Sequence, residues 1–223
     1  MSTSRKELTQ IYRRLYRHYG DLHWWPGDTP LEISVGAILT QNTAWTNVEK
    51  AIRRLKEARS LCVRALHALS QRRLASLIKP AGYFNVKARR LQNFISFLQG
   101  RYSGSLRKMF NQETDRLRLE LLSINGTGRE TADSILLYAG EKPIFVIDAY
   151  TKRILSRHGV MRYEKNYDEF QRLFMQHLPP DVTLYNQYHA MLVNIGKDFC
   201  RKRPLCNLCP LNGWRGVPPL RST

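Results

Sequence analysis

The apolar residues of this chain recur with the period of an α-helix from one end of the sequence to the other. In residues 5–20 (RKELTQIYRRLYRHYG), one apolar stripe is followed by a glycine suited to end a helix: Leu8, Ile11, Tyr12, Leu15 and Tyr19, then Gly20. Similar patterns occupy residues 31–41, 44–58, 60–69, 70–78, 86–102, 113–124, 129–140, 148–159, 167–178 and 184–200. The helix expected over 31–41 has few charges and is expected to be buried, and Ser70 is the candidate N-cap of the helix over 70–78. A β-branched run before Asp148 is short, and no series of strands with alternating polarity follows. The sequence therefore predicts an all-α fold.

The charge of the chain is strongly positive and spread along its length. The 36 lysines and arginines outnumber the 18 aspartates and glutamates, so the formal net charge is +18 and the isoelectric point is near 10.2. A folded body with this charge attracts polyanions, of which nucleic acid is the commonest. A solvated basic surface and an anionic membrane surface are the alternatives. Because no apolar run reaches the length of a membrane span and the first residues lack a signal-peptide core, we expect a soluble monomer without a membrane partner. Its expected location is the cytoplasm, or the nucleoid in a prokaryote.

Residues 123–135 (SINGTGRETADSI) place a Gly-x-Gly turn between two helical patterns. Gly126 and Gly128 permit positive φ, so the chain can reverse within a few residues. The helix that follows presents its first amides and the positive end of its dipole, where a phosphate oxygen binds well. The candidate phosphate-binding residues here are Gly126, Thr127, Gly128 and Arg129. A tight helix–helix turn without a ligand would need the same glycines, so that interpretation stays open.

Four stretches of the chain together resemble the endonuclease III superfamily of DNA glycosylases. Residues 121–159 resemble its helix-hairpin-helix and Gly/Pro/Asp motif, with Pro143 in the connection and Asp148 at the next helix start. The other three are GAILTQNTAW (36–45), AGYFNVKARRL (81–91) and CRKRPLCNLCPL (200–211). The resemblance implies two helical lobes with double-stranded DNA bound in the cleft between them. Residues 31–137 would form a helical barrel with the hairpin, and residues 1–30 with 138–223 the second lobe.

The same resemblance assigns the chemistry to Asp148. The matching carboxylate is catalytic in the family, since loss of a base develops positive charge on the deoxyribose that a fixed carboxylate stabilises. The alternative is that Asp148 only caps its helix. Family members that also cleave the strand carry a lysine nucleophile two residues after the second glycine of the hairpin. That position is Glu130 here, so we expect a monofunctional glycosylase, with Lys152 as a phosphate contact rather than a substitute nucleophile.

A base flipped out of the duplex needs a pocket with aromatic faces, and three tryptophans are candidates. Trp24 and Trp25 are adjacent, and Trp45 follows the TQNTA segment. Tryptophan is the strongest cation–π partner, which favours a cationic alkylated purine. The pattern resembles the 3-methyladenine DNA glycosylase III branch, in which the residue matching Gln41 fills the hole left by the base. The two adjacent tryptophans could instead anchor a core. Oxidised pyrimidine, mismatched adenine and a non-catalytic DNA-structure binder are the alternative functions.

Three of the four cysteines cluster near the C-terminus: Cys200, Cys206 and Cys209. The family's iron–sulfur loop uses four thiolates, but here the first gap is one residue short and the fourth position is Arg215. We expect catalysis to need no cofactor. The three thiolates could hold a structural iron–sulfur cluster with an outside ligand, or zinc with a histidine such as His189; a decayed site kept by packing is the alternative. Cys62, inside a helical pattern, is expected in the core.

Overall fold

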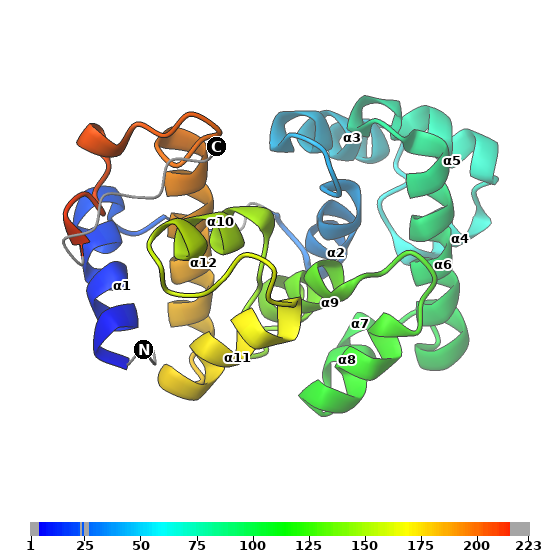
Figure 1. The fold of residues 1–223 in the computed structure, drawn as a ribbon. Coiled ribbons are helices and arrows are strands. Elements are labelled where there is room, and N and C mark those ends of the chain that lie inside the picture. The colour runs from blue at the N-terminus through cyan, green and yellow to red at the C-terminus, as the bar shows by residue number, and fades with distance from the viewer. Residues whose placement is uncertain (1–4, 23, 25–26, 215–223) are drawn as a thin grey trace. The chain divides into compact units, whose positions relative to one another are not determined.

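The computed structural model describes residues 5–22, 24 and 27–214, and every regular element among them is a helix or helical turn (Figure 1). None of these described residues lies in a β-strand. The prediction of an all-α fold is therefore confirmed. The chain divides into two compact units, the first comprising residues 1–25 with 143–223 and the second residues 26–142. Each unit has its own buried core and is described separately below.

The second unit is built around α2 (Pro30–Leu39), an apolar helix that is buried along almost its whole length. It packs against α3 (Trp45–Glu57), α6 (Phe84–Tyr102), α9 (Arg129–Ser134) and η2 (Ile135–Ala139). The helix begins where the Thr29 hydroxyl accepts a hydrogen bond from the Glu32 amide at 3.2 Å, and Pro30 occupies the first helical position. A helix that is apolar all round is stable only when it is surrounded in this way.

Shorter helices complete the second unit around the long helix α6. They are α4 (Val63–Ala68), α5 (Gln71–Leu77), η1 (Lys79–Ala81), α7 (Leu106–Phe110) and α8 (Thr114–Leu122). Ser70 caps α5 as the sequence predicts, its hydroxyl accepting from the Arg73 amide at 3.3 Å. The helix after the hairpin changes from α to π geometry at Ile135, and π-helical turns of this kind are frequent near functional sites.

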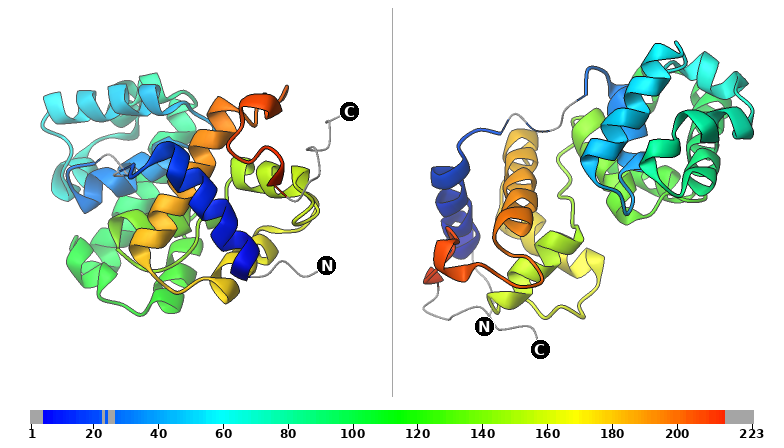
Figure 2. Two further views of the ribbon diagram at one scale, coloured as in Figure 1. Left: turned by 90° about the vertical axis from the view of Figure 1, so that its left-hand side faces the viewer. Right: turned by 90° about the horizontal axis from the view of Figure 1, so that it is seen from above.

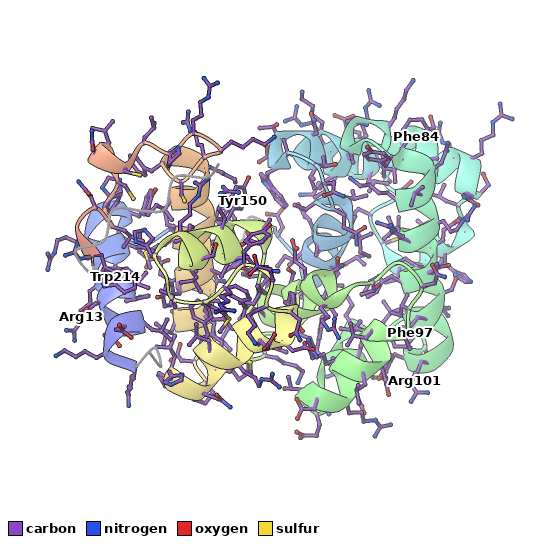
Figure 3. The ribbon with its side chains drawn as sticks, viewed as in Figure 1. Arg13, Phe84, Phe97, Arg101, Tyr150 and Trp214 are labelled. Carbon is purple, nitrogen blue, oxygen red and sulfur yellow. The ribbon has the colours of Figure 1, made fainter. Side chains whose placement is uncertain are left out.

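The first unit consists of α1 (Arg5–Tyr19), α10 (Ala149–Arg157), α11 (Tyr167–His177), α12 (Val182–Asp198) and η3 (Cys206–Leu208). Helices α1 and α12 come from opposite ends of the chain and pack side by side (Figure 2). The Tyr188 hydroxyl of α12 donates to the Leu8 carbonyl of α1 at 2.9 Å inside this contact. Near the C-terminal end, Trp214 is buried in the same unit and its indole N–H reaches Gln10 of α1 (Figure 3).

The core of the first unit is aromatic and lies under the connection that leads into α10. Phe145 stacks on Phe174 with ring centroids 3.8 Å apart, and Tyr185 meets the Phe145 ring edge-on. Residues 144–147 are buried but form no strand. The backbone of this segment forms hydrogen bonds with side chains of α11 rather than with another strand. Gln171 donates to the Phe145 carbonyl at 2.7 Å, and the Ile147 amide donates to the Tyr167 hydroxyl at 3.2 Å. This buried segment fixes where the following residue, Asp148, stands.

Candidate active site

Asp148 is the N-cap of α10, as its position at a helix start predicts. Its backbone is extended, with φ −115° and ψ 179°, and its Oδ1 accepts a hydrogen bond from the Thr151 amide at 2.7 Å. The carboxylate therefore sits at the positive end of the helix dipole, which stabilises its charge. Its side chain is only 11% exposed. One oxygen is thus fixed by the helix, and the second, Oδ2, remains available for other groups.

His189 of α12 is the side chain next to that second oxygen. Its Nε2 is 3.9 Å from Asp148 Oδ2, and its side chain is 6% exposed. Burial lowers the pKa of His189, while the Asp148 carboxylate acts in the opposite direction. Sequence reasoning considered this histidine only as a zinc ligand and did not place it beside Asp148. The available signal was a lone histidine within an apolar helix, HAMLV, whose neighbours all face the core.

Lys152 and Trp24 are the other predicted site residues of the first unit that the structure describes. Lys152, one turn after Asp148, holds its ammonium 4.9 Å from the Tyr163 ring centroid and 5.4 Å from that of Phe170. Trp24 is half-buried, and the Lys197 ammonium lies 5.6 Å from its ring centroid. Both contacts have cation–π geometry. Trp25 lies outside the described residues.

In the second unit, the hairpin between α8 and α9 has the tight turn that its glycines predict. Gly126 has φ +96°, and a Cβ at this position would stand 2.2 Å from the Arg90 Cγ. Gly128 is the N-cap of α9 and has an extended backbone at φ −86° and ψ 176°, so only Gly126 of the two uses the positive φ that glycine permits. It has no side chain to cap the helix, and a Cβ there would meet no atom within 4 Å. The buried Thr127 donates its amide to the Ile124 carbonyl at 2.9 Å.

Gln41 is bound to this hairpin by its side chain. Its Nε2 donates to the Gly126 carbonyl at 3.2 Å and to the Thr131 hydroxyl at 2.8 Å, and its Oε1 accepts from the Arg90 guanidinium. Two of these hydrogen bonds connect the loop after α2 to the hairpin, at its turn and at α9, and the third connects the loop to α6. The resemblance to the family assigned Gln41 to the DNA duplex, and it did not predict these contacts 85 and 90 residues away in the sequence.

Lys87 fixes the same loop from the other side. Its side chain is almost fully buried and its ammonium donates to the carbonyls of Leu39 and Ala81, both at 2.8 Å, and to the Thr43 hydroxyl. Burial, with a smaller contribution from Arg90, lowers the pKa of Lys87 to about 8. The loop after α2 is thereby joined to the loop that begins α6.

Three further side chains of the second unit lie at the starts of its helices. Tyr83, immediately before α6, is 75% exposed and has φ +44°, so its ring stands in solvent next to the loop that Lys87 fixes. Its exposure was not predicted, although it lies within the AGYFNVKARRL segment. Trp45 is the first residue of α3; it is half-buried, and its indole N–H donates to Glu49 at 3.0 Å. Glu130 is exposed in the first turn of α9.

The cysteine segment of the first unit is held by arginines of α10. Arg157 is buried and donates to the Cys200 Sγ at 3.4 Å and to the carbonyls of Arg201 and Lys202 at 2.6 and 3.2 Å. Arg153 donates to the carbonyls of Cys200 and Gly196 at 2.7 and 3.1 Å. Burial raises the pKa of the Cys209 thiol.

The side chains around this segment do not fit a four-thiolate cluster. A guanidinium contacts Cys200, and the fourth ligand position in the sequence is an arginine, Arg215, which lies outside the described residues. Among residues 5–22, 24 and 27–214, no three or more His, Cys, Asp or Glu side chains are grouped to hold a metal ion. The expectation that Cys62 is a core residue is wrong: it is exposed at the N-cap of α4, where its Sγ accepts from the Ala65 amide at 3.4 Å.

Comparison with known proteins agrees with this architecture. The sequence profile of the HhH-GPD superfamily of base excision DNA repair proteins matches residues 35–180. MJ1434 of Methanocaldococcus jannaschii, provisionally named as a DNA repair glycosylase, is 48% identical over 206 residues, or 92% of this chain and 93% of that protein. Helicobacter pylori 3-methyladenine DNA glycosylase (MagIII), solved with 1,N6-ethenoadenine, is 26% identical with a TM-score of 0.74, covering 87% and 98% of the two chains. A non-covalent endonuclease III–DNA complex, at 23% identity, shares the fold with a TM-score of 0.80 over 94% of both chains.

The chain belongs to the HhH-GPD superfamily of base excision DNA repair proteins. It is a DNA glycosylase that binds DNA and acts in base excision repair. The expected resemblance to the 3-methyladenine DNA glycosylase III branch is confirmed by the likeness to the Helicobacter pylori enzyme. Within the part of the chain that the structure describes, no helix combines the length and the apolarity that crossing a bilayer requires.

Proposed function

We propose that this glycosylase is monofunctional and hydrolyses the N-glycosidic bond of an alkylated purine of the 3-methyladenine type in double-stranded DNA. The observation that carries the proposal is the carboxylate of Asp148. Its Oδ1 is fixed at 2.7 Å from the Thr151 amide, at the positive end of α10. A carboxylate held in this way requires no reorganisation as positive charge develops on the deoxyribose. Its free oxygen can also orient the attacking water.

The residue at the lyase position supports base release without strand cleavage. Glu130 stands in the first turn of α9, where strand-cleaving relatives of the family carry a lysine. A carboxylate cannot form the imine that breaks the strand. Lys152 lies on α10, not on the hairpin helix that carries the lyase position, and is the proposed phosphate contact of α10. The product is therefore an intact strand with an abasic site.

The hairpin supports a role in DNA backbone binding. The amides at the start of α9 receive no cap from Gly128, and the space around that glycine is open. Together with Gly126, Thr127 and Arg129 they form a site for a phosphate oxygen that positions the duplex without reading its sequence. The resemblance implies one lobe of residues 31–137, which carries the hairpin, and a second lobe of residues 1–30 plus 138–223, which carries Asp148. The first lobe would then bind the DNA backbone and the second would supply the catalytic carboxylate.

The choice of an alkylated purine rests on the tryptophans and on the related enzyme. Trp45 and one of Trp24 or Trp25 are the proposed walls of the base pocket, and a methylated purine carries the positive charge that tryptophan faces attract. Such a base is already a good leaving group, so one carboxylate suffices as the catalytic group. The likeness to an enzyme named 3-methyladenine DNA glycosylase supports the same class of base. Gln41 is the proposed side chain that fills the space of the flipped base.

Single-turnover assays on methylated duplex DNA test this function. We expect the wild-type protein to release free 3-methyladenine, to leave the strand intact until hot alkali, and to give no borohydride-trapped adduct with abasic DNA. Asp148→Asn should lower the rate of base release by about 10³-fold, since it removes the charge. The variant should still bind DNA, because asparagine also caps helices well.

Three outcomes would contradict parts of the proposal. Release only from oxidised-pyrimidine or mismatched-adenine duplexes would overturn the assigned base but not the role of Asp148. A borohydride-trapped adduct would overturn the assignment as monofunctional. If the wild type and Asp148→Asn both bind DNA and neither releases any base, the chain is a non-catalytic DNA binder.

A further inference from the structure

The two oxygens of the Asp148 carboxylate have different surroundings. Oδ1 accepts the Thr151 amide at 2.7 Å, which belongs to the cap of α10 and leaves this oxygen little freedom. Oδ2 is the oxygen that the cap does not use, and the His189 Nε2 stands 3.9 Å from it. Helix α12, which carries His189, packs directly against α10, so both groups are held by elements of the same unit.

The distance between Nε2 and Oδ2 suits one hydrogen-bonded water. A separation of 3.9 Å is too long for a direct hydrogen bond, whereas one water can stand about 2.8 Å from each of the two atoms. The Thr151 hydroxyl, buried beside the same cap, has no hydrogen-bond partner among the described residues. A buried hydroxyl of this kind is usually satisfied by water. The surroundings of Asp148 therefore contain polar groups that an ordered water would complete.

Burying a histidine side chain costs free energy unless its ring nitrogens form polar interactions. The residues next to His189 in α12, including Tyr188, Ala190 and Met191, are buried, so the imidazole stands among apolar side chains. Lys197, on the same helix, and Asp148, at the start of α10, are the charged groups that act on the imidazole. A neutral imidazole can still donate its Nε2 proton to a carboxylate oxygen or to a water bound to it.

We propose that His189 is a positioning residue for Asp148, which directs Oδ2 toward the deoxyribose by donating its Nε2 proton to that oxygen through one water. This inference rests on the proposed catalytic role of Asp148. With Oδ1 held by the helix and Oδ2 held by His189, the carboxylate has one orientation before the lesion arrives. Such preorganisation affects the rate of base release rather than the affinity for DNA.

Substitutions that keep or remove the donor test the proposal. In His189→Gln the side-chain amide provides an N–H near the position of Nε2, whereas His189→Leu provides an apolar side chain of similar size. We expect His189→Leu to lower the single-turnover rate on methylated duplex DNA on the order of 100-fold. His189→Gln should restore the rate to within several-fold of wild type. The Kd for an abasic-analogue duplex and the melting temperature should be close to those of wild type in both variants. His67→Leu, at an exposed histidine of α4, is the matched control and should leave the rate unchanged.

A double variant separates positioning from an independent role. If His189 acts through Asp148, then Asp148→Asn combined with His189→Leu should be no slower than Asp148→Asn alone. A further loss in the double variant would overturn the proposal. So would equal rates in wild type and His189→Leu, or equal losses in the Leu and Gln variants. An unchanged rate in Asp148→Asn would instead overturn the proposed function itself.

The test remains decisive if His189→Leu does not fold. His189→Asn places its amide nearer the position of Nδ1 and cannot reach Oδ2 as Gln does. A faster rate in His189→Gln than in His189→Asn, at matched melting temperatures, is then the expected result. Equal rates would contradict the positioning role.

Discussion

At the scale of single residues, Lys87 is the clearest case of a charge held inside the fold. Its three hydrogen-bond acceptors, two carbonyls and a hydroxyl, are all neutral. Burial lowers the pKa of the ammonium to about 8, so we expect the ¹³Cε resonance of Lys87 to titrate near pH 8 in the folded protein. The reference pKa of a lysine in an unstructured peptide is about 10.4. A midpoint above 10 for Lys87 would contradict the prediction.

The same residue predicts a pH dependence of stability. The pKa of Lys87 is lower in the folded state than in the unfolded chain, so the unfolded state binds the proton more tightly between about pH 8 and 10.5. Stability contributed by this group therefore rises across that window and is lowest below it. Lys87→Met, which strands the three acceptors, should lose about 2 kcal/mol of unfolding free energy at pH 7. The difference from wild type in urea unfolding should grow as the pH is raised from 8 to 10.

At the scale of elements, the hairpin offers a matched pair of glycines. Gly126→Ala should destabilise the protein by about 2 kcal/mol or more, because φ is +96° and the new Cβ would stand 2.2 Å from the Arg90 side chain. Gly128→Ala should change stability by less than about 1 kcal/mol, since its φ of −86° and open surroundings accept a methyl group. Urea unfolding of both variants checks this pair. Equal losses of unfolding free energy in the two variants would contradict the backbone conformations described for this turn.

The elements themselves were largely predictable from the sequence, but their contacts were not. Apolar periodicity predicted an all-α chain and the burial of α2, and the residue types at Ser70 and Asp148 predicted helix starts, because these features depend on neighbouring residues. The exposure of Cys62 was predicted wrongly. Cys62 lies in a helical pattern but is the N-cap of α4, and the ends of helices are uncertain from sequence by one or two residues.

For the candidate site, the sequence predicted the residues that belong to local motifs but not the residues that contact them. Asp148 and the hairpin were found because their residue types and spacing are local. The partners of these residues were missed, because His189 approaches Asp148 from 41 positions away and Gln41 binds the hairpin from another helix end. Contacts of this kind arise when helices pack, and no periodicity in one segment encodes them.

At the scale of the whole molecule, the formal charge of +18 predicts DNA affinity that falls steeply with salt. Each phosphate neutralised by a lysine or arginine should contribute about 0.9 to the slope of log Kd against log salt concentration. We expect Lys152→Met to reduce that slope by about one, since Lys152 is the proposed phosphate contact of α10. Lys165→Met, which removes an exposed lysine paired with Glu169 at 2.7 Å, is the matched control and should leave the slope unchanged. Identical slopes in both variants, measured by fluorescence anisotropy, would remove Lys152 from the DNA interface.

The cap formed by Asp148 has an evolutionary consequence. Its Oδ1 caps the N-terminus of α10 by accepting the Thr151 amide, so most substitutions at this position weaken the helix by about 1 kcal/mol, whether or not they affect catalysis. A lineage that no longer needed base release would still keep a short polar residue at this position in order to fold. Asparagine or serine would meet that need and would silence the enzyme. Relatives that lost activity should therefore carry one of these two residues far more often than alanine or leucine.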